Sequence, residues 1–490
     1  MRLHAQVKMK TETTTIVATT KDWALVHVFA APILFLSMLL LPLATYPIRC
    51  SFGLLMWMAW WWIARPVHLG VTGLLPLAVV AVFNFVPIAE VLPSYADEVI
   101  ILLVAANILS AVWHRWGLDR RIALASLLGV GTSTTRQILI WYLIAVALSA
   151  FLPRSVVAAT LIPIVIAMLR YIGIEDLWNS KFGTALILAI AWGSSIGGFL
   201  TPLGGAPNLL AMKFVQDQVT HHEFLFITWF TRNAPLTIAL VGVLLIYLRF
   251  GLKAEISEAP GSRSYFKNEF RALGAITPQE KWGLALFVLA TALSFTRQFY
   301  AALLPNLSPS FSFLAFAVAA FVVRPQRQHL ITWEYAQGQL MWGLFYVFAG
   351  GTALGVVMSR TGAAKYIAET LVPYAGGGGF GAVFAFTAVT LLVSQFISNV
   401  ASVAIIGPVA IGMFQNLAEN PAPYIYILAA ASHCGFMLPS SSGSSAIAAG
   451  YGVNLKTMFV KGLWAALIAL VVITAGAFLL MSLWPGFSYA

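Results

Sequence analysis

Long apolar runs recur along the whole chain and dominate its pattern of hydrophobic and polar positions. Several approach the ~20 residues that a helix needs to cross the hydrocarbon core of a bilayer. The clearest runs are residues 24–47, 70–92, 136–152, 236–249, 281–295, 311–323, 379–393 and 463–484. They are continuous rather than alternating, so they predict α-helices and not a transmembrane β-barrel. With shorter or broken segments included, we expect roughly 11 to 14 membrane-embedded pieces.

The composition indicates that lipid is the solvent for most of the surface. Hydrophobic residues make up 60% of the chain and charged residues only 9%, compared with roughly 25% charged residues in soluble domains. We therefore expect an all-α, multi-pass protein of the cell membrane. Residues 1–23 are predicted to be a cytoplasmic tail, 24–250 and 281–490 to be two halves, and 251–280 to be a cytoplasmic loop between them.

The net charge of +11 comes from lysine and arginine residues gathered in short polar loops. The main clusters are Arg115, Arg120, Arg121 and Arg136; Lys253, Arg263, Lys267 and Arg271; and Arg324, Arg327 and His329. Loops of this kind lie on the cytoplasmic side of membrane proteins. We therefore interpret the charge as a topology signal, and expect the bilayer rather than nucleic acid as partner. The two cysteines, Cys50 and Cys434, predict neither a disulfide framework nor a metal site.

The two halves contain matching segments. At an offset of 245 residues, Ser149, Phe151, Pro163 and Met168 match Ser394, Phe396, Pro408 and Met413. At an offset of 237 residues, Ser195, Gly198, Phe199 and Pro202 match Ser432, Gly435, Phe436 and Pro439. Small and polar residues inside apolar surroundings predict, in each half, a helix interrupted near the membrane midplane, as in transporters built from repeats. Ordinary kinks packed against small residues are the alternative, but kinks alone do not explain the matched positions.

These segments resemble motifs of the divalent anion/sodium symporters, which carry dicarboxylates, citrate or sulfate. Ser398–Asn399–Val400 lies ten residues before Pro408, like the Ser-Asn-Thr motif of that family, and Gly204–Asn208 is similar to its Thr-Pro-Pro-Asn stretch. Further matches are Phe436–Pro439, Gly117–Leu124, Leu273–Gly274 with Glu280–Lys281, and Phe348–Gly351 with Thr361–Gly362. The resemblance covers most of the chain. It implies a homodimer with a scaffold and a transport domain, two inverted-topology repeats with re-entrant hairpins, and elevator-like movement.

The chain departs from the family pattern at two places. Pro153–Arg154–Ser155 stands where the first half of the family has Ser-Asn-Thr, and Ser442–Ser445 stands where the second has Thr-Pro-Pro-Asn. The resemblance implies one sodium ion per half beside the substrate. For the second sodium site we expect Ser394, Ser398, Asn399 and Ser441, and for a degraded first site Ser149 and Gly204.

An anionic substrate needs positive potential, which helix N-termini and unpaired backbone N–H groups supply. The candidate substrate-binding residues lie at the matched breaks: Arg154, Ser155, Thr201, Gly205, Pro207, Asn208, Ser398, Asn399, Val400, Ser442, Gly443, Ser444 and Ser445. One hypothesis is that the Arg154 guanidinium replaces the first sodium ion, so that transport needs fewer sodium ions or none and proceeds as exchange. The alternative is that Arg154 reaches the membrane surface from a helix end.

The distribution of ionisable residues favours an anion as cargo. No carboxylate falls at the centre of a clear apolar run, where proton pumps and cation antiporters need one. A membrane-embedded enzyme would need a cluster of catalytic side chains at bilayer depth, and the sequence displays none. His433 could couple protons, although a lone histidine is more often a packing residue.

The sequence therefore predicts a secondary active transporter of small divalent anions, with a C4-dicarboxylate as the first choice. A sodium-coupled sulfate or organosulfonate symporter and a passive anion channel are the alternatives. No cofactor is expected, and Na⁺ is the candidate coupling ion.

Overall fold

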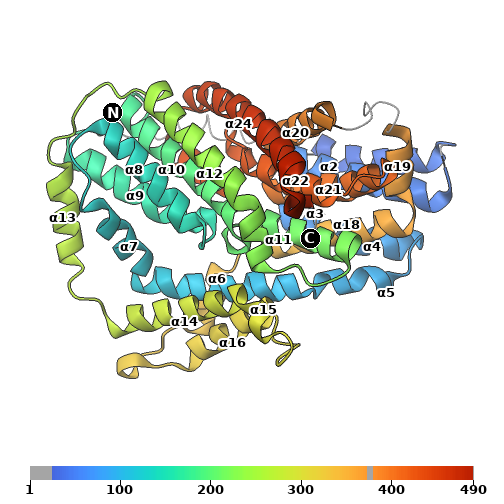
Figure 1. Cartoon of the computed structure of the whole chain (residues 1–490), viewed down its shortest axis with the longest axis horizontal. Coiled ribbons are helices and arrows are strands. Elements are labelled where there is room, and N and C mark those ends of the chain that lie inside the picture. The colour runs from blue at the N-terminus through green and yellow to red at the C-terminus, as the bar shows by residue number, and fades with distance from the viewer. Residues whose placement is uncertain (1–24, 43, 372–378, 489–490) are drawn as a thin grey trace, which may run out of the picture.

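The computed structural model describes residues 25–42, 44–371 and 379–488. Within these ranges the chain forms helices and no named strand, and the only β-contact is an isolated bridge between Ser133 and Glu258. Among the described residues, eight helices are long and apolar enough to cross a membrane, and four shorter apolar helices accompany them. The predicted all-α membrane class is confirmed (Figure 1).

The helices up to the central loop, in chain order, are Leu25–Leu40, α2 (Tyr46–Ala64), α3 (Leu69–Thr72), α4 (Leu75–Phe83), α5 (Ile88–Val91), η1 (Leu92–Tyr95), α6 (Glu98–Trp116), α7 (Leu118–Leu127), α8 (Thr134–Ser149), α9 (Arg154–Tyr171), α10 (Lys181–Leu200), η2 (Pro202–Gly204), α11 (Ala206–Val215), the π-helical η3 (Gln216–Thr220) and α12 (Phe226–Gly251).

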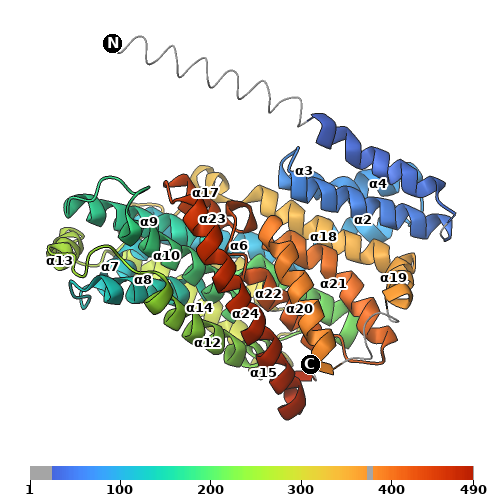
Figure 2. The ribbon, with the colours of Figure 1, turned by 90° about the horizontal axis from the view of Figure 1, so that it is seen from above.

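The later helices are α13 (Ser262–Ala272), α14 (Pro278–Phe295), α15 (Arg297–Tyr300), α16 (Pro309–Val322), η4 (Pro325–Arg327), α17 (Trp333–Gln339), α18 (Trp342–Arg360), α19 (Ala363–Leu371), α20 (Gly379–Phe396), α21 (Asn399–Asn416), α22 (Ala422–His433), η6 (Pro439–Ser441), α23 (Gly443–Gly450), α24 (Leu455–Leu483) and α25 (Pro485–Ser488). Figure 2 shows Leu25–Leu40 and α2 beside α18, at the opposite end of the molecule from α7 and α13.

One apolar run does not form the single span that its length predicts. Residues 70–92 divide into α3, α4, α5 and the start of η1. Asn84 ends α4 in the left-handed conformation, with φ 46°, and Pro87 is the N-cap of α5. Because proline has no N–H to donate and disfavours helical geometry in the residue before it, the helix cannot continue through this point.

Both matched segments of the sequence form the same local structures. α8 and α9 make a helix pair with a tip at residues 150–153, and α20 and α21 make a second pair with a tip at residues 397–398. α10 breaks at Thr201 and resumes as α11, and α22 breaks at Cys434 and resumes as α23. Each half therefore contains one tight hairpin and one broken helix; the inverted orientation of the two halves stays a prediction.

Close backbone contacts hold each hairpin against the broken helix that follows it. A Cβ atom on Gly204 would lie 2.5 Å from the carbonyl oxygen of Ser149, and one on Gly435 would lie 2.8 Å from that of Ser394. Glycine is therefore the only residue that fits at either place without displacement of the hairpin. Ser149 and Ser394 are matched positions, whereas Gly204 and Gly435 are not, so the two hairpins are packed by comparable but not identical contacts.

Polar side chains complete the hydrogen bonds that the helix breaks leave open. In the first half Asn208 is fully buried, and its Nδ2 donates to the carbonyl oxygens of Gly198 and Thr201 at 2.7 and 2.8 Å. In the second half Ser441 Oγ donates to the carbonyl oxygen of Gly435 at 2.7 Å. Non-helical backbone at membrane depth is tolerated only where protein or a cavity satisfies it.

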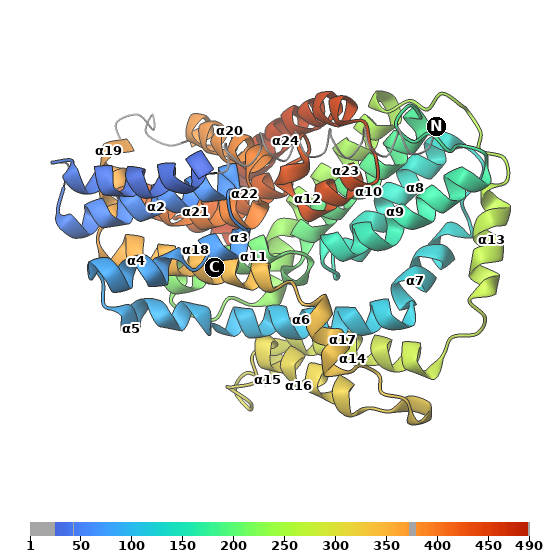
Figure 3. The same ribbon diagram turned by 180° about the vertical axis from the view of Figure 1, so that it is seen from behind.

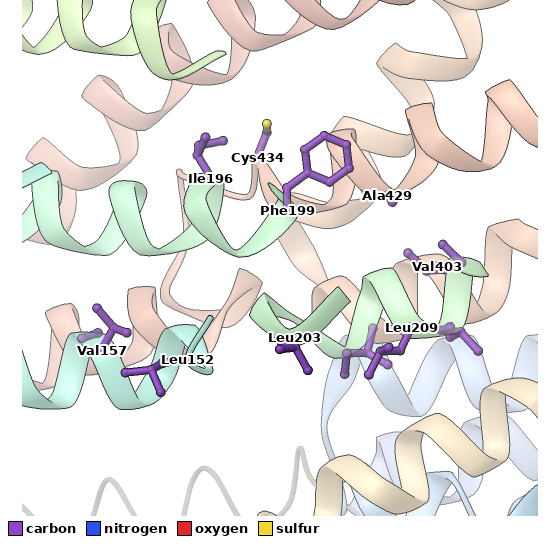
Figure 4. Packing of buried hydrophobic residues seen from close by; sticks show 14 of the residues in the cluster. Leu152, Val157, Ile196, Phe199, Leu203, Leu209, Val403, Ala429 and Cys434 are labelled. Atoms are coloured by element: carbon purple, nitrogen blue, oxygen red, sulfur yellow. The ribbon is translucent and has the colours of Figure 1, made fainter. Parts of the chain in front are cut away.

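Apolar packing encloses both breaks. Figure 4 shows Ile196 and Phe199 of α10, Leu203 of η2, and Ala429 and Cys434 of the α22 segment within this core. α10 is buried almost along its entire length. Gly193 and Gly197 bring it against α8, since a Cβ atom on Gly197 would lie 2.1 Å from the carbonyl oxygen of Val146. Small residues at a helix interface allow such close approach in membrane proteins.

The three basic loops meet at one side of the molecule, as the positive-inside rule requires. Arg121 Nε donates to Glu280 Oε1 at 2.5 Å, and Arg120 Nη2 donates to Glu269 Oε2 at 2.6 Å. Trp116 Nε1 donates to the carbonyl oxygen of Leu330 at 2.8 Å. The expected loop at 251–280 contains an additional helix, α13, which lies beside α7 (Figures 1 and 3).

Candidate functional site

An interior cavity of about 600 Å³ lies where the two hairpin tips and the two helix breaks meet. Pockets of this size are typical of small-molecule sites. Its lining contains no aspartate or glutamate among the described residues, and its only ionisable side chains there are Arg154 and His68. We refer to this space as the anion cavity, because the charge of its lining suits an anionic ligand.

Four helices begin at the wall of the anion cavity. Its lining includes Arg154 at the start of α9, Ala206 of α11, Asn399 of α21 and Gly443 of α23. The N-terminus of a helix carries unsatisfied N–H groups and roughly half a positive charge. Four such ends directed at one space make a strong site for carboxylate, sulfate or phosphate groups.

Arg154 adds a full positive charge to this wall. It is the first residue of α9, directly after the N-cap Pro153. Its Nη1 is buried without a hydrogen-bond partner, and across the described ranges the guanidinium makes no ion pair. Arg154 lines the cavity between the hairpin tips. This position does not fit the alternative interpretation, in which the side chain reaches the membrane surface. A guanidinium in such a place is costly unless an anion offsets its charge.

Asn399 presents an unused amide at the second hairpin tip. The residue is 1% exposed, it lines the anion cavity, and neither Oδ1 nor Nδ2 has a partner within the described chain. Beside it, Ser398 Oγ caps α21 by accepting from the Ala401 N–H at 3.3 Å. A hard cation such as Na⁺ prefers oxygen ligands. The free Asn399 Oδ1 is an oxygen of this kind, and Ser398 and Ser441 line the same cavity.

The anion cavity contains ten of the residues predicted for the substrate and sodium sites. They are Arg154, Ser155, Gly204, Gly205, Ser398, Asn399, Val400, Ser441, Ser442 and Gly443. The structure therefore brings together segments separated by almost 300 residues of sequence. Their roles as ligands stay predictions.

The remaining predicted residues lie behind the lining and contact protein atoms. They are Ser149, Thr201, Pro207, Asn208, Ser394, Ser444 and Ser445. Ser444 Oγ donates to the carbonyl oxygen of Ala191 at 3.1 Å, which ties α23 to α10. Ser442 Oγ donates to Ser445 Oγ at 2.9 Å, and Thr201 Oγ1 donates to the carbonyl oxygen of Ala150. In this conformation these side chains support the wall of the cavity.

Ser149 keeps an unused polar group at the first helix break. Its hydroxyl is fully buried and has no partner in the part of the chain that the structure describes. Ser394, its match in the second half, instead donates to the carbonyl oxygen of Thr390 at 2.6 Å.

Some lining residues were not expected from the sequence. The opposite wall of the anion cavity comes from His68, from Asn107 of α6, and from residues 340–347 before and within α18. His68 Nδ1 accepts from the Gly70 N–H at 3.2 Å, so Nε2 carries the proton in the neutral ring. Asn107 could have been identified from the sequence, because an amide inside an otherwise apolar span faces protein or a cavity.

His433 lies between the two broken helices and outside the anion cavity. It is fully buried, its Nδ1 lies 2.9 Å from the carbonyl oxygen of Ala429, and its ring packs on Phe199. A Cβ atom on Gly205 would lie 3.0 Å from its Nε2. These contacts fit the packing interpretation better than proton coupling.

Two solved structures share the fold. MtrF of Neisseria gonorrhoeae, from a class of antimetabolite efflux pumps, aligns with a TM-score of 0.58 and 14% identity over 91% of this chain and 97% of that chain. The YdaH transporter of Alcanivorax borkumensis aligns with a TM-score of 0.56 and 14% identity, covering 81% of this chain and 88% of that chain. At this identity the likeness concerns the fold alone.

Sequence relatives are more specific. The sodium-dependent dicarboxylate transporter SdcS of Staphylococcus saprophyticus is 29% identical over 442 residues, which cover 87% of this chain and 85% of that protein. SdcS of Staphylococcus aureus strain bovine RF122 is 29% identical over 439 residues, which cover 85% of this chain and 83% of that protein. Residues 19–485 also match the family described as the sodium:sulfate symporter transmembrane region. The resemblance inferred from the hairpin and break motifs is thereby confirmed, and the chain belongs to the sodium:sulfate symporter family.

Proposed function

We propose that the protein is a secondary active transporter of small divalent anions across the cell membrane, and that a C4-dicarboxylate is its main substrate. The observation that carries this proposal is the unpartnered guanidinium of Arg154 in an acid-free cavity. The SdcS relatives, which are named as dicarboxylate transporters, support the choice of substrate. The four helix N-termini supply further positive potential for a dianion.

Arg154 is proposed to bind one carboxylate of the substrate in a bidentate fork. It occupies the place where the family pattern has an asparagine of the first sodium site, so its fixed charge takes over part of the role of a sodium ion. The second hairpin keeps Asn399 and Ser398 as neutral oxygen donors. We therefore expect one coupling sodium ion at most, and exchange of anions when sodium is absent.

The proposed movement follows from the two kinds of wall around the anion cavity. One wall consists of the hairpin tips and helix breaks, and the other consists of α6, His68 and residues 340–347. In an elevator-type mechanism the first group would move with the substrate, while the second would belong to a static scaffold that dimerises. Only the moving wall carries Arg154 and Asn399, so the substrate would keep its main contacts during translocation.

Sulfate is the second candidate. The description of the family names it, and an acid-free cavity also suits this smaller dianion. Sulfate would leave more of the cavity filled by water than a four-carbon diacid would. The test therefore measures the uptake of both anions.

The test uses purified protein in liposomes. Uptake of labelled succinate and labelled sulfate is followed with external sodium and with choline in its place, into empty vesicles and into vesicles preloaded with unlabelled substrate. If succinate enters preloaded vesicles equally well with sodium and with choline, the result supports the proposal that the fixed charge of Arg154 replaces a coupling sodium ion. Sodium-driven uptake into empty vesicles supports active transport in which the second sodium site still binds a coupling ion. Absence of both succinate uptake and exchange under all conditions would reject the proposed substrate.

A further inference from the structure

Two further cavities lie next to the anion cavity and share residues with it. The first, of about 550 Å³, is lined by the N-terminal end of α6, by α11 and η3, and by residues 221–226 and 305–310. It shares Leu102 and Leu209 with the anion cavity. The second, of about 100 Å³, lies toward the C-terminal end of α6 and shares Asn107.

The three cavities follow one another along α6. Glu98, Leu102, Ala106, Ser110 and His114 each line one or two of them. They are spaced four residues apart, and each such step turns about 40° around a helix of 3.6 residues per turn, so they form a stripe that winds around α6. At 1.5 Å per residue, this stripe is about 24 Å long, or most of the ~30 Å hydrocarbon thickness. The cavities therefore mark a route along α6 through most of the membrane.

The cavity at the N-terminal end of α6 differs in charge from the anion cavity. Asp97, Glu98, Asp217 and Glu223 line it, together with Lys213. Because the C-terminal end of α6 leads into the basic loop with Arg115 and Arg121, which is the cytoplasmic side, this acidic cavity faces the opposite side of the membrane. We refer to it as the outer cavity.

The shared leucines separate the two spaces. Leu102 of α6 is 2% exposed, Leu209 of α11 is 4% exposed, and both line both cavities, so they lie where the two spaces adjoin. One turn further along α11, Lys213 Nζ lies 2.9 Å from Asp97 Oδ2 and 3.0 Å from Asp217 Oδ2. The Lys213–Asp97 ion pair links α11 to the N-cap of α6, and thus holds the two helices together beside the leucines.

We infer that Leu102 and Leu209 form an apolar barrier that closes the route along α6 between the anion cavity and the outer cavity, and that the Lys213–Asp97 pair keeps it closed. A narrow apolar constriction blocks ions because water is excluded from it. The barrier stops substrate and other small anions from leaking past the transport site. The inference rests on the proposed function for the identity of the transported anion, but not for the existence of the barrier.

The test measures access by a membrane-impermeant maleimide added to the outer face of sealed right-side-out vesicles. Val99→Cys reports on the outer cavity and Ala106→Cys on the anion cavity. Both natural cysteines are fully buried and serve as the unreactive background. With both leucines intact, we expect Val99→Cys to react and Ala106→Cys to react at least tenfold more slowly.

Shortening both leucines, by Leu102→Ala with Leu209→Ala, should raise the reaction of Ala106→Cys toward that of Val99→Cys. The matched pair Leu102→Ile with Leu209→Met keeps the volume and should leave it slow. Equal reaction of Ala106→Cys in all three backgrounds would overturn the barrier. A slow reaction of Ala106→Cys after both leucines are shortened would also overturn it. In that case a normal reaction of Val99→Cys shows that the protein is folded.

Succinate uptake by the same vesicles separates this claim from the proposed function. Failure of succinate uptake together with the expected maleimide pattern would reject the substrate and keep the barrier. Normal uptake with the contrary maleimide pattern would keep the substrate and reject the barrier. A Lys213→Met variant should also speed the reaction of Ala106→Cys, and an unchanged rate would reject the role of the ion pair.

Discussion

The carbonyl oxygen of Ser149 lies 2.5 Å from the point where Gly204 would carry a Cβ atom. This contact fixes the first hairpin tip against the first helix break. In the second half Ser394 makes a comparable contact with Gly435, which is not the match of Gly204. The wall that carries the candidate ligands is thus held together by backbone packing and not by long side chains. Transport therefore depends on residues that never touch the substrate.

Gly204→Ala is expected to lower stability and to abolish transport. The added methyl group meets two backbone carbonyl oxygens, of Ser149 and Gly198, which cannot rotate away. Overpacking of this kind costs about 1–3 kcal/mol. Thermal unfolding of the purified protein measures this loss of stability.

Gly242→Ala is the control for this substitution. It lies in α12, where a Cβ atom meets nothing within 4 Å, and it should be neutral or stabilising by roughly 0.5–1 kcal/mol. Equal effects of the two substitutions would contradict the packing argument.

Asn399→Ala is expected to weaken the stimulation of transport by sodium. The Asn399 Oδ1 is the buried oxygen without a partner at the second hairpin tip, so its loss deletes a ligand that no neighbour replaces. The half-activating sodium concentration in the uptake assay measures this effect, and it should rise at least about tenfold, which corresponds to roughly 1.4 kcal/mol. Asn268→Ala, on the exposed face of α13, should not change it. An unaltered sodium response of Asn399→Ala would exclude this residue from the ion site.

Glu280→Gln should destabilise the protein much more than Glu269→Gln. Both carboxylates pair with arginines of the same loop, but Glu280 is 3% exposed, whereas the Arg120–Glu269 pair lies at the surface. Removing one partner of a buried pair costs about 3–5 kcal/mol, while an exposed pair contributes about 0–1 kcal/mol. Unfolding by denaturant compares the two variants, and similar losses would show that burial does not matter here.

The same pair gives a pH dependence. Burial raises the pKa of Glu280, but hydrogen bonds from Arg121 and from Thr277 outweigh it, so the pKa lies below its ordinary value of 4.5. A lowered pKa in the folded state stabilises the protein above pH 4.5, and this contribution is lost as the pH falls through the lowered pKa. Below pH 4.5, the difference in stability between the unaltered protein and Glu280→Gln should shrink. A constant difference from pH 7 to pH 3 would contradict this assignment.

The sequence was informative where a local pattern decides the structure. Continuous apolar runs predicted the helices, and matched glycine, proline and serine positions located both hairpin tips and both breaks, because these residues interrupt helices wherever they occur. Asn84 and Pro87 also indicate a helix end, but the length of the apolar run at 70–92 favoured a single span, and that prediction was wrong.

The rest depends on contacts between distant segments. His68 and residues 340–347 reach the anion cavity only through the packing of α3 against α18, which no local pattern encodes. For the same reason the sequence could not separate Ser442, which lines the cavity, from Ser444, which donates to the backbone of α10, and Ser445, whose hydroxyl accepts from Ser442. The spacing of the serines predicted that the segment 442–445 contributes to the site. Which of its side chains face the cavity depends on the helical turn that begins at Gly443.

The central claim is that Arg154 binds the anion, and the most direct measurement is the affinity of purified protein for succinate by calorimetry. Arg154→Gln keeps a polar side chain of similar length but removes the charge, whereas Arg170→Gln makes the same change at the exposed end of the same helix. A hydrogen bond to a charged group is worth about 1.5–3 kcal/mol, so the dissociation constant of Arg154→Gln should rise roughly 10- to 100-fold, and that of Arg170→Gln should not change. Unchanged succinate affinity in a folded Arg154→Gln protein would contradict the account.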